Sequence, residues 1–354
     1  MRSQLVLAFC LVAGFEGLAQ TTAATPPQGL PKDPRAILAA AAPFYDFSDP
    51  TLKPFHLKAT YQLYDDKGKP TEQGTFEYWW ASPAVHRITW TRAGATYTDW
   101  YTTGGKHAFL SSAKGPSFFE YKLASAFLSP LPDAGELDPN KFRLDREEVK
   151  LGTAKLPCVM VIPKMPQHGQ LQVVPLGLFP TYCFDPNVPA LRVNYSFGTV
   201  AEGFDSIVKV QGRFLPKEIH FVEGERKLLD ATVQSIDGLT ASDPALTPEP
   251  HATYPGVEKV QISAAMIAGR LVKQVPPFYP AGAKMARVSG TVVLGATIGR
   301  DGRIHELHVI EAPWPSLVAS AMWAVSQWEY KPYLLNGEPV EVDTTINVIY
   351  TLGN

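Results

Sequence analysis

This chain of 354 residues lacks three features that would place it in common protein classes. Its 32 Lys and Arg residues are balanced by 34 Asp and Glu residues, so it has no excess of positive charge for binding nucleic acid. No apolar run reaches the roughly 20 residues that a membrane-spanning helix needs. The 3 cysteines show no CxxC or Cys-His spacing typical of a zinc site. We therefore expect no nucleic-acid partner, no metal and no other cofactor.

The usual catalytic motifs are also missing. The sequence contains no GxSxG elbow, no HExxH motif and no phosphate-binding P-loop. His305 and His308 invite a metal-site hypothesis, but they fall in a predicted strand, where residues three apart point to opposite faces. The sequence therefore predicts a binding protein rather than an enzyme.

The first twenty residues predict the compartment. Arg2 precedes an apolar run over residues 5–15, and Glu16 and small residues follow it, as in a secretory signal peptide. We expect cleavage after Ala19, so that residues 1–19 are removed and the mature protein is periplasmic. The alternative is an uncleaved helix that anchors the chain in the inner membrane, facing the periplasm.

The middle of the chain divides into a tether, a β-rich domain and a linker. Residues 20–49 form the tether, with one short helix that starts at Asp33-Pro34. Residues 50–240 alternate apolar and polar side chains between turns, which is typical of antiparallel strands. Several prolines then predict a semi-rigid linker over residues 241–257. The predicted strands of the β-rich domain lie at 56–64, 74–80, 86–92, 96–101, 106–111, 159–162, 191–197, 206–214, 216–222 and 227–235, with a helix over 117–127.

Removal of residues 1–19 leaves two cysteines, Cys158 and Cys183. An even pair in an oxidising compartment predicts a disulfide. Two separate buried thiols are the alternative, because a sequence does not show the distance between two Cα atoms.

Residues 258–354 predict a small α+β domain. Strands over 291–299 and 304–311 form a hairpin, an amphipathic helix over 316–330 follows, and a long strand over 340–352 closes the domain. The fold class of the whole chain is therefore α+β. It combines a mainly antiparallel β domain, similar to a half-barrel, with a small C-terminal α+β domain.

Short motifs recur in a defined order along residues 258–352. They are Tyr279-Pro280, Ala283, Val288, Gly290, Asp301-Gly302, Ala321, Ala324, Trp328, Tyr330-Lys331-Pro332, Asn336-Gly337 and Pro339. This pattern resembles the C-terminal domain of the TonB energy-transducer family. The resemblance implies a periplasmic domain that binds N-terminal segments of outer-membrane receptors by adding a strand.

The final strand is the predicted binding edge, because it is long and ends the chain. An extended peptide satisfies the unpaired N–H and C=O groups of such an edge. Alternatively, a second copy of the chain covers this edge, as in a homodimer, or the N-terminal domain covers it. The candidate peptide-binding residues are Pro276, Pro277, Tyr279, Pro280, Thr344, Thr345, Ile346, Asn347 and Val348.

The N-terminal domain carries a second resemblance. Its strand motif over residues 74–80, followed by Ser82-Pro83 and Trp100-Tyr101, is similar to the LolA/RseB type of periplasmic half-barrel. The resemblance implies an apolar concavity for a lipid or lipoprotein ligand.

The two resemblances lead to one main hypothesis and one alternative. A TonB transducer has an N-terminal membrane helix and a long Pro-rich spacer, whereas this apolar run is short and a folded domain replaces the spacer. We therefore predict a non-catalytic periplasmic protein that binds receptor peptides and a second ligand. The alternative is a membrane-anchored energy transducer for TonB-dependent transport.

Overall fold

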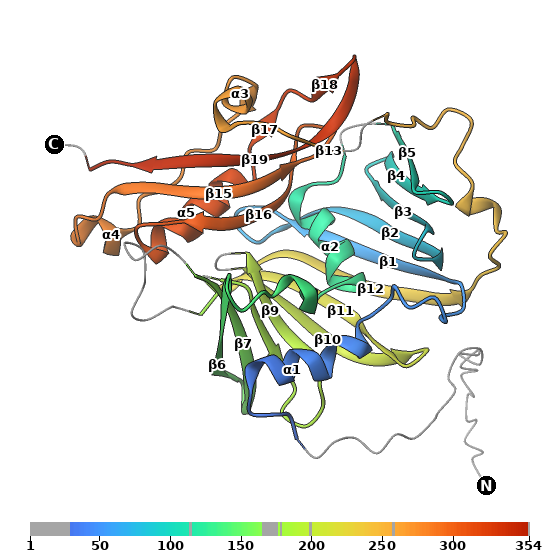
Figure 1. Cartoon of the computed structure of the whole chain (residues 1–354), viewed down its shortest axis with the longest axis horizontal. Coiled ribbons are helices and arrows are strands. Elements are labelled where there is room, and N and C mark those ends of the chain that lie inside the picture. Colours follow the sequence, from blue (N-terminus) through green and yellow to red (C-terminus); the bar gives the residue numbers. More distant parts are fainter. Residues whose placement is uncertain are drawn as a thin grey trace, which may run out of the picture.

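The computed structural model describes residues 29–112, 115–164, 176–177, 179–197, 200–256 and 259–352. The predicted signal peptide and residues 20–28 of the predicted tether lie outside the described residues. The described chain is built around one large and one small sheet (Figure 1). Strands dominate and helices are few, as the predicted fold class requires.

The large sheet has 12 antiparallel strands in the order β5-β4-β3-β2-β1-β12-β11-β10-β9-β8-β7-β6. It is open, since β5 and β6 form its two edges, and the half-barrel prediction is confirmed in that sense. The strands are β1 (Phe55–Tyr64), β2 (Pro70–Ser82), β3 (Val85–Arg92), β4 (Ala95–Thr102), β5 (Lys106–Ser111), β6 (Phe142–Leu151), β7 (Ala154–Pro163), β8 (Thr181–Phe184), β9 (Leu191–Phe197), β10 (Val200–Val210), β11 (Arg213–Glu223) and β12 (Arg226–Gly238).

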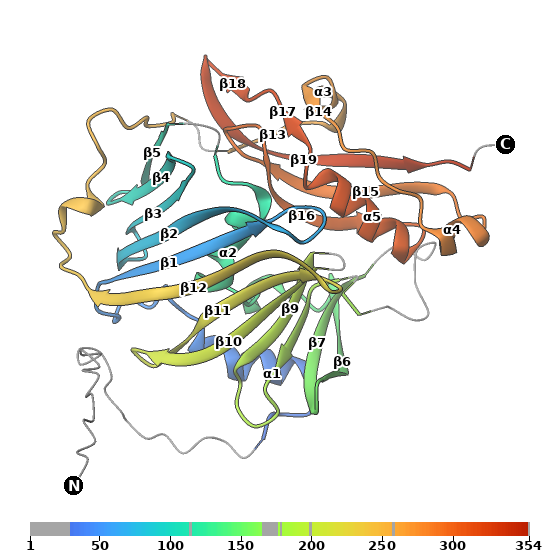
Figure 2. The ribbon, with the colours of Figure 1, turned by 180° about the vertical axis from the view of Figure 1, so that it is seen from behind.

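Two helices lie on the same face of this sheet, which we call the inner face (Figures 1 and 2). Helix α1 (Pro34–Ala41) starts at Asp33, whose carboxylate accepts the N–H of Ala36. Helix α2 (Phe118–Leu128) connects the two edge strands, β5 and β6. Both helices share one hydrophobic core with the inner-face aromatic side chains, among them Phe55, Phe76, Trp80, Trp90, Phe204 and Phe221.

The predicted disulfide is confirmed. Cys158 on β7 stands directly opposite Cys183 on β8, with an S–S distance of 2.02 Å. Both cysteines are fully buried in a small cluster with Leu156 and Val193. The alternative of two separate thiols is therefore wrong.

The C-terminal module, residues 259–352, contains the small sheet in the order β13-β19-β15-β16. Strand β18 also pairs with β19, and β14 pairs with β17. Helix α5 packs on one face through Leu317, Val318 and Ala321, which are buried. The elements are β13 (Lys259–Gln261), α3 (Ala264–Ala268), β14 (Leu271–Lys273), α4 (Ala281–Met285), β15 (Gly290–Ile298), β16 (Ile304–Glu311), α5 (Pro315–Val325), β17 (Glu329–Tyr330), β18 (Tyr333–Leu335) and β19 (Glu338–Tyr350).

Two expectations for individual elements are wrong, and one strand was not predicted. The strand predicted over 206–214 crosses the turn at Gln211 and Gly212, which separates β10 from β11. The unpredicted strand is β6, which contains the charged residues 145–148 and leaves their side chains in water at the edge of the sheet. Helix α5 ends at Val325, because residues 329–330 pair with β14 instead of continuing the helix.

Candidate functional site

The outer edge of β19 is the first candidate site. Its inner edge pairs with β15 from Val342 to Tyr350. Near its start, β19 pairs with β18 at residues 338–340. Its outer edge pairs with β13 at residues 341–343, and α3 packs beside β19. Among the described residues, no strand pairs with the outer edge from Thr344 to Tyr350, where β19 runs toward the C-terminus (Figure 1).

The hydrogen bond from Ile262 to β19 tells which peptide groups face outward. The Ile262 N–H donates to the carbonyl of Asp343 at 2.9 Å, so Asp343 directs its main chain to the outer edge. Because main-chain direction alternates along a strand, Thr345, Asn347 and Ile349 direct their N–H and C=O groups the same way. The side chains of the intervening predicted residues, Thr344, Ile346 and Val348, are buried.

The predicted proline stretch lies across α5 rather than along the open edge. The Trp328 indole donates to the Val275 carbonyl at 2.8 Å, and the Ser320 hydroxyl donates to the Phe278 carbonyl. These bonds hold Pro276 and Pro277 in a segment that leads to Pro280, the residue before α4. Tyr279 lies against β19, with its ring 5.4 Å from that of Tyr350 and edge-on to it.

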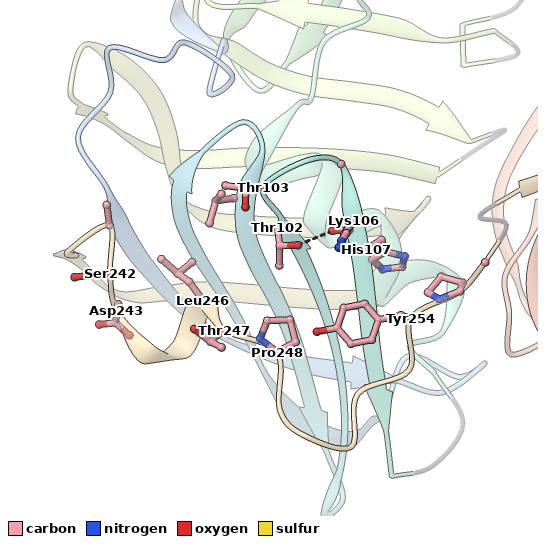
Figure 3. Close-up of a pocket in the computed structure, with 15 residues that line it drawn as sticks. Thr102, Thr103, Lys106, His107, Ser242, Asp243, Leu246, Thr247, Pro248 and Tyr254 are labelled. Atoms are coloured by element: carbon pink, nitrogen blue, oxygen red, sulfur yellow. Dashed lines mark hydrogen bonds between the residues drawn. The ribbon is translucent and has the colours of Figure 1, made fainter.

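A second candidate site is a cavity of about 1280 Å³ between the β4–β5 hairpin and the segment after β12. That segment is fixed at both ends: the Ala245 carbonyl accepts the Trp100 indole N–H at 3.0 Å, and Thr253 exchanges two hydrogen bonds with Phe109. Hydroxyl groups and the exposed Tyr254 ring surround the cavity (Figure 3). The side chains labelled there are Thr102, Thr103, Lys106, His107, Ser242, Asp243, Leu246, Thr247, Pro248 and Tyr254.

Helix α2 carries a buried carboxylate that sequence reasoning missed. Glu120 is 1% exposed, accepts the Tyr61 hydroxyl at 2.5 Å and pairs with Arg92 at 2.8 Å. It also accepts the N–H of Ser117 at 2.7 Å, which caps the helix. Burial alone would raise the pKa of Glu120, but these hydrogen bonds and the Arg92 charge lower it. Glu120 therefore remains ionised and fixes α2 to the inner face.

A second buried charge lies where the two parts of the molecule meet. His305 is 3% exposed and faces Asp301 at 3.4 Å and Glu341 at 3.8 Å. Its ring stacks on Tyr121 of α2 at 3.7 Å between centroids. Burial alone would lower the pKa of His305, but the two carboxylates raise it to about 9. His308 lies over Gly295 on the small sheet and does not join this cluster.

No local pattern could have shown the interface between α2 and the C-terminal module. Tyr121 and His305 are far apart in the sequence, and each is typical of an ordinary core or strand position.

Within the described residues, no group of three His, Cys, Asp or Glu side chains is arranged to hold a metal ion. None of the described helices has the length and apolar character needed to cross a membrane.

Comparison with known proteins identifies one part of the chain. Residues 275–352 match the family model of the Gram-negative bacterial TonB protein C-terminal. The C-terminal resemblance seen in the sequence is thereby confirmed for this segment. A comparison with curated protein sequences gives no match.

Three solved structures are similar to 60% of the chain, at low TM-scores. One is a putative outer membrane lipoprotein-sorting protein domain from Vibrio parahaemolyticus, with 8% identity, 94% of that chain covered and a TM-score of 0.37. Another is a LolA superfamily protein from Nitrosomonas europaea, with 8% identity, 97% coverage and a TM-score of 0.37. A DUF1329 family protein from Desulfovibrio piger has 13% identity, 98% coverage and a TM-score of 0.33.

Proposed function

We propose that the chain is a non-catalytic protein of the bacterial envelope that binds extended peptide segments of outer-membrane receptors as an added strand on β19. The open outer edge from Thr344 to Tyr350 carries this proposal. An incoming peptide would meet the N–H and C=O groups of Thr345, Asn347 and Ile349 and satisfy them with its own main chain. The match of residues 275–352 to the TonB C-terminal family supports an outer-membrane receptor as the partner.

The other edge of the small sheet is less available. Helix α2 packs against β16, the strand at the opposite edge from β13 (Figure 1). Strand addition is therefore directed to β19. The peptide would follow β13 along the same outer edge of β19.

A proline substitution tests strand addition. Asn347→Pro removes an outward N–H without touching the ladder to β15, whereas Asn347→Ala keeps that N–H and serves as the matched control. One lost hydrogen bond costs about 0.5–1.5 kcal/mol, so we expect up to roughly tenfold weaker binding for the proline variant and almost none for the alanine variant. The measurement is calorimetric titration of the full chain with synthetic peptides from receptor N-termini. Equal loss in both variants would show that the side chain, not the main chain, is recognised.

A second function is supported by the inner face of the large sheet. Its aromatic side chains form a broad apolar surface, and the described helices that cover it, α1 and α2, have only 8 and 11 residues. Displacing a short helix would uncover a surface suited to the acyl chain of a lipid or lipoprotein. Titration with a dansyl-labelled C11 fatty acid, followed by energy transfer from tryptophan, tests this binding.

The place of the protein in the envelope is part of the proposal. We propose a periplasmic protein whose signal peptide is removed, and the membrane-anchored energy transducer remains the alternative. Mass spectrometry of the protein isolated from cells decides between them. A mature chain that starts near Gln20 supports the periplasmic form, whereas a chain that retains Met1 supports the anchored form.

A further inference from the structure

We infer that α2 couples the two parts of the molecule: the docked C-terminal module holds α2 on the inner face, so an apolar ligand occupies that face only when the module is released. This inference rests on the second function proposed above, the binding of an acyl chain. It adds the regulation of that site, which is exerted by residues of the C-terminal module.

One side of α2 is bound to the large sheet. Glu120 bonds to Tyr61 and Arg92, and its carbonyl accepts the Trp90 indole N–H at 3.0 Å. About two helical turns further on, the Phe127 ring stacks on Phe76 with centroids 5.6 Å apart. The space left beside Trp90 and Glu120 is only about 30 Å³, which has room for about one water molecule and none for an acyl chain.

The flanks of the same helix are bound to the C-terminal module. Tyr121 stacks on His305, and Phe119 lies 6.2 Å from Trp323 of α5, measured between ring centroids. Just before α2, the Gly115 carbonyl accepts a hydrogen bond of 2.7 Å from Arg303. Figure 1 shows α2 between the two sheets, and these contacts account for that position.

Tyr121 makes the two attachments interdependent. Its ring stacks on His305 on one side and lies 5.5 Å from the Trp90 ring, nearly parallel to it, on the other. Lifting α2 from the sheet therefore breaks the contact with the C-terminal module as well. By thermodynamic linkage, ligand binding on the inner face and docking of the module oppose each other by the same factor.

Two substitutions on the C-terminal module weaken docking and leave the inner face unchanged. Trp323→Ala removes the contact with Phe119, and Arg303→Gln weakens the bond to the Gly115 carbonyl. Trp314→Ala is the matched control, since this partly exposed tryptophan stands at the other end of α5. Circular dichroism and the intact disulfide verify that each full-length variant is folded.

The dansyl-labelled C11 fatty acid serves as the probe. We expect the variant that combines Trp323→Ala and Arg303→Gln, the double variant, to bind the probe about tenfold more tightly than the wild type. This factor is typical of coupling between two sites. Trp314→Ala should bind it as the wild type does. Hydrogen exchange of the unsubstituted protein gives a second test: the probe should increase exchange in α2 and in residues 299–305 together.

The outcomes separate this inference from the function on which it rests. If the wild type, the double variant and Trp314→Ala bind the probe with equal affinity, and the probe leaves exchange in residues 299–305 unchanged, that result would confirm acyl-chain binding and overturn the coupling. Absence of probe binding in every variant would overturn both.

Discussion

The two sheets of the molecule present their candidate binding surfaces in opposite ways. The large sheet has a broad aromatic face that its own helices α1 and α2 cover, whereas the small sheet leaves main-chain groups of β19 unpaired by any described strand beyond Asp343. An apolar face in water is unfavourable, so the chain covers it. Unpaired peptide groups at an edge are hydrated until a peptide replaces the water. In the functions proposed above, the C-terminal site would therefore bind without rearrangement, whereas the N-terminal site would first have to be uncovered.

The largest expected effect tests whether the C-terminal module folds separately from the large sheet. Gly302 has φ +82°, and an added Cβ would lie 1.9 Å from the Tyr330 carbonyl oxygen. We expect Gly302→Val to destabilise the module by more than about 3 kcal/mol, as measured by urea unfolding.

Gly337→Ala is the control for Gly302→Val. Gly337 also has positive φ, but nothing lies within 4 Å of its added Cβ, so we expect a loss of only about 1 kcal/mol. If Gly302→Val unfolds the module while the large sheet keeps its own transition, the two parts fold separately. One common transition would show that docking through α2 makes them a single cooperative unit.

The next largest effect is expected from removing the disulfide, and it should lower the stability of the large sheet alone. Replacing Cys158 and Cys183 with Ala opens a loop with a sequence separation of 25 residues. The chain-entropy model predicts a loss of about 3 kcal/mol in unfolding free energy. We expect unchanged peptide affinity at β19, measured by calorimetry, because the bond lies far from that edge. Loss of peptide binding would contradict the independence of the C-terminal site.

A pH dependence reports on the contact between the two parts. The pKa of His305 is raised from 6.5 to about 9, so its charge stabilises the folded state fully below pH 6.5, and this stabilisation is lost as pH rises through about 9. The loss is on the order of 3 kcal/mol. Urea unfolding of the wild type between pH 6 and pH 10 should show it, and His305→Gln should abolish this alkaline decline. An identical decline in the variant would assign it to another group.

Much of the fold could be predicted, because it follows from local patterns of apolar, polar and turn residues in the sequence. Strict alternation and Gly-containing turns placed β1 to β5 within a few residues, and the Asp301-Gly302 turn located the hairpin of β15 and β16. Strand β6 was missed because an edge strand with charged side chains on both faces has no alternation to detect. The end of α5 was placed too late because the apolar spacing continues into Trp328, whose indole bonds to Val275 instead.

The candidate sites depend on contacts between distant residues, and these are less visible in a sequence. Reasoning from the end of the chain selected β19, and the resemblance to the TonB family agreed with that choice. Neither the reasoning nor the resemblance showed that β13 and β18 pair with the first half of β19. The attachment of α2 to both sheets through Tyr121 depends on tertiary packing alone and left no signal in the sequence.

The most direct test of the account is amide hydrogen exchange along β19, measured residue by residue on the full-length protein with and without a receptor N-terminal peptide. We predict that the peptide slows exchange at Thr345, Asn347 and Ile349, whose N–H groups face outward, and leaves Ile346 and Val348 unchanged because they already bond to β15. Protection confined to α5, with the three outward amides unchanged, would contradict strand addition.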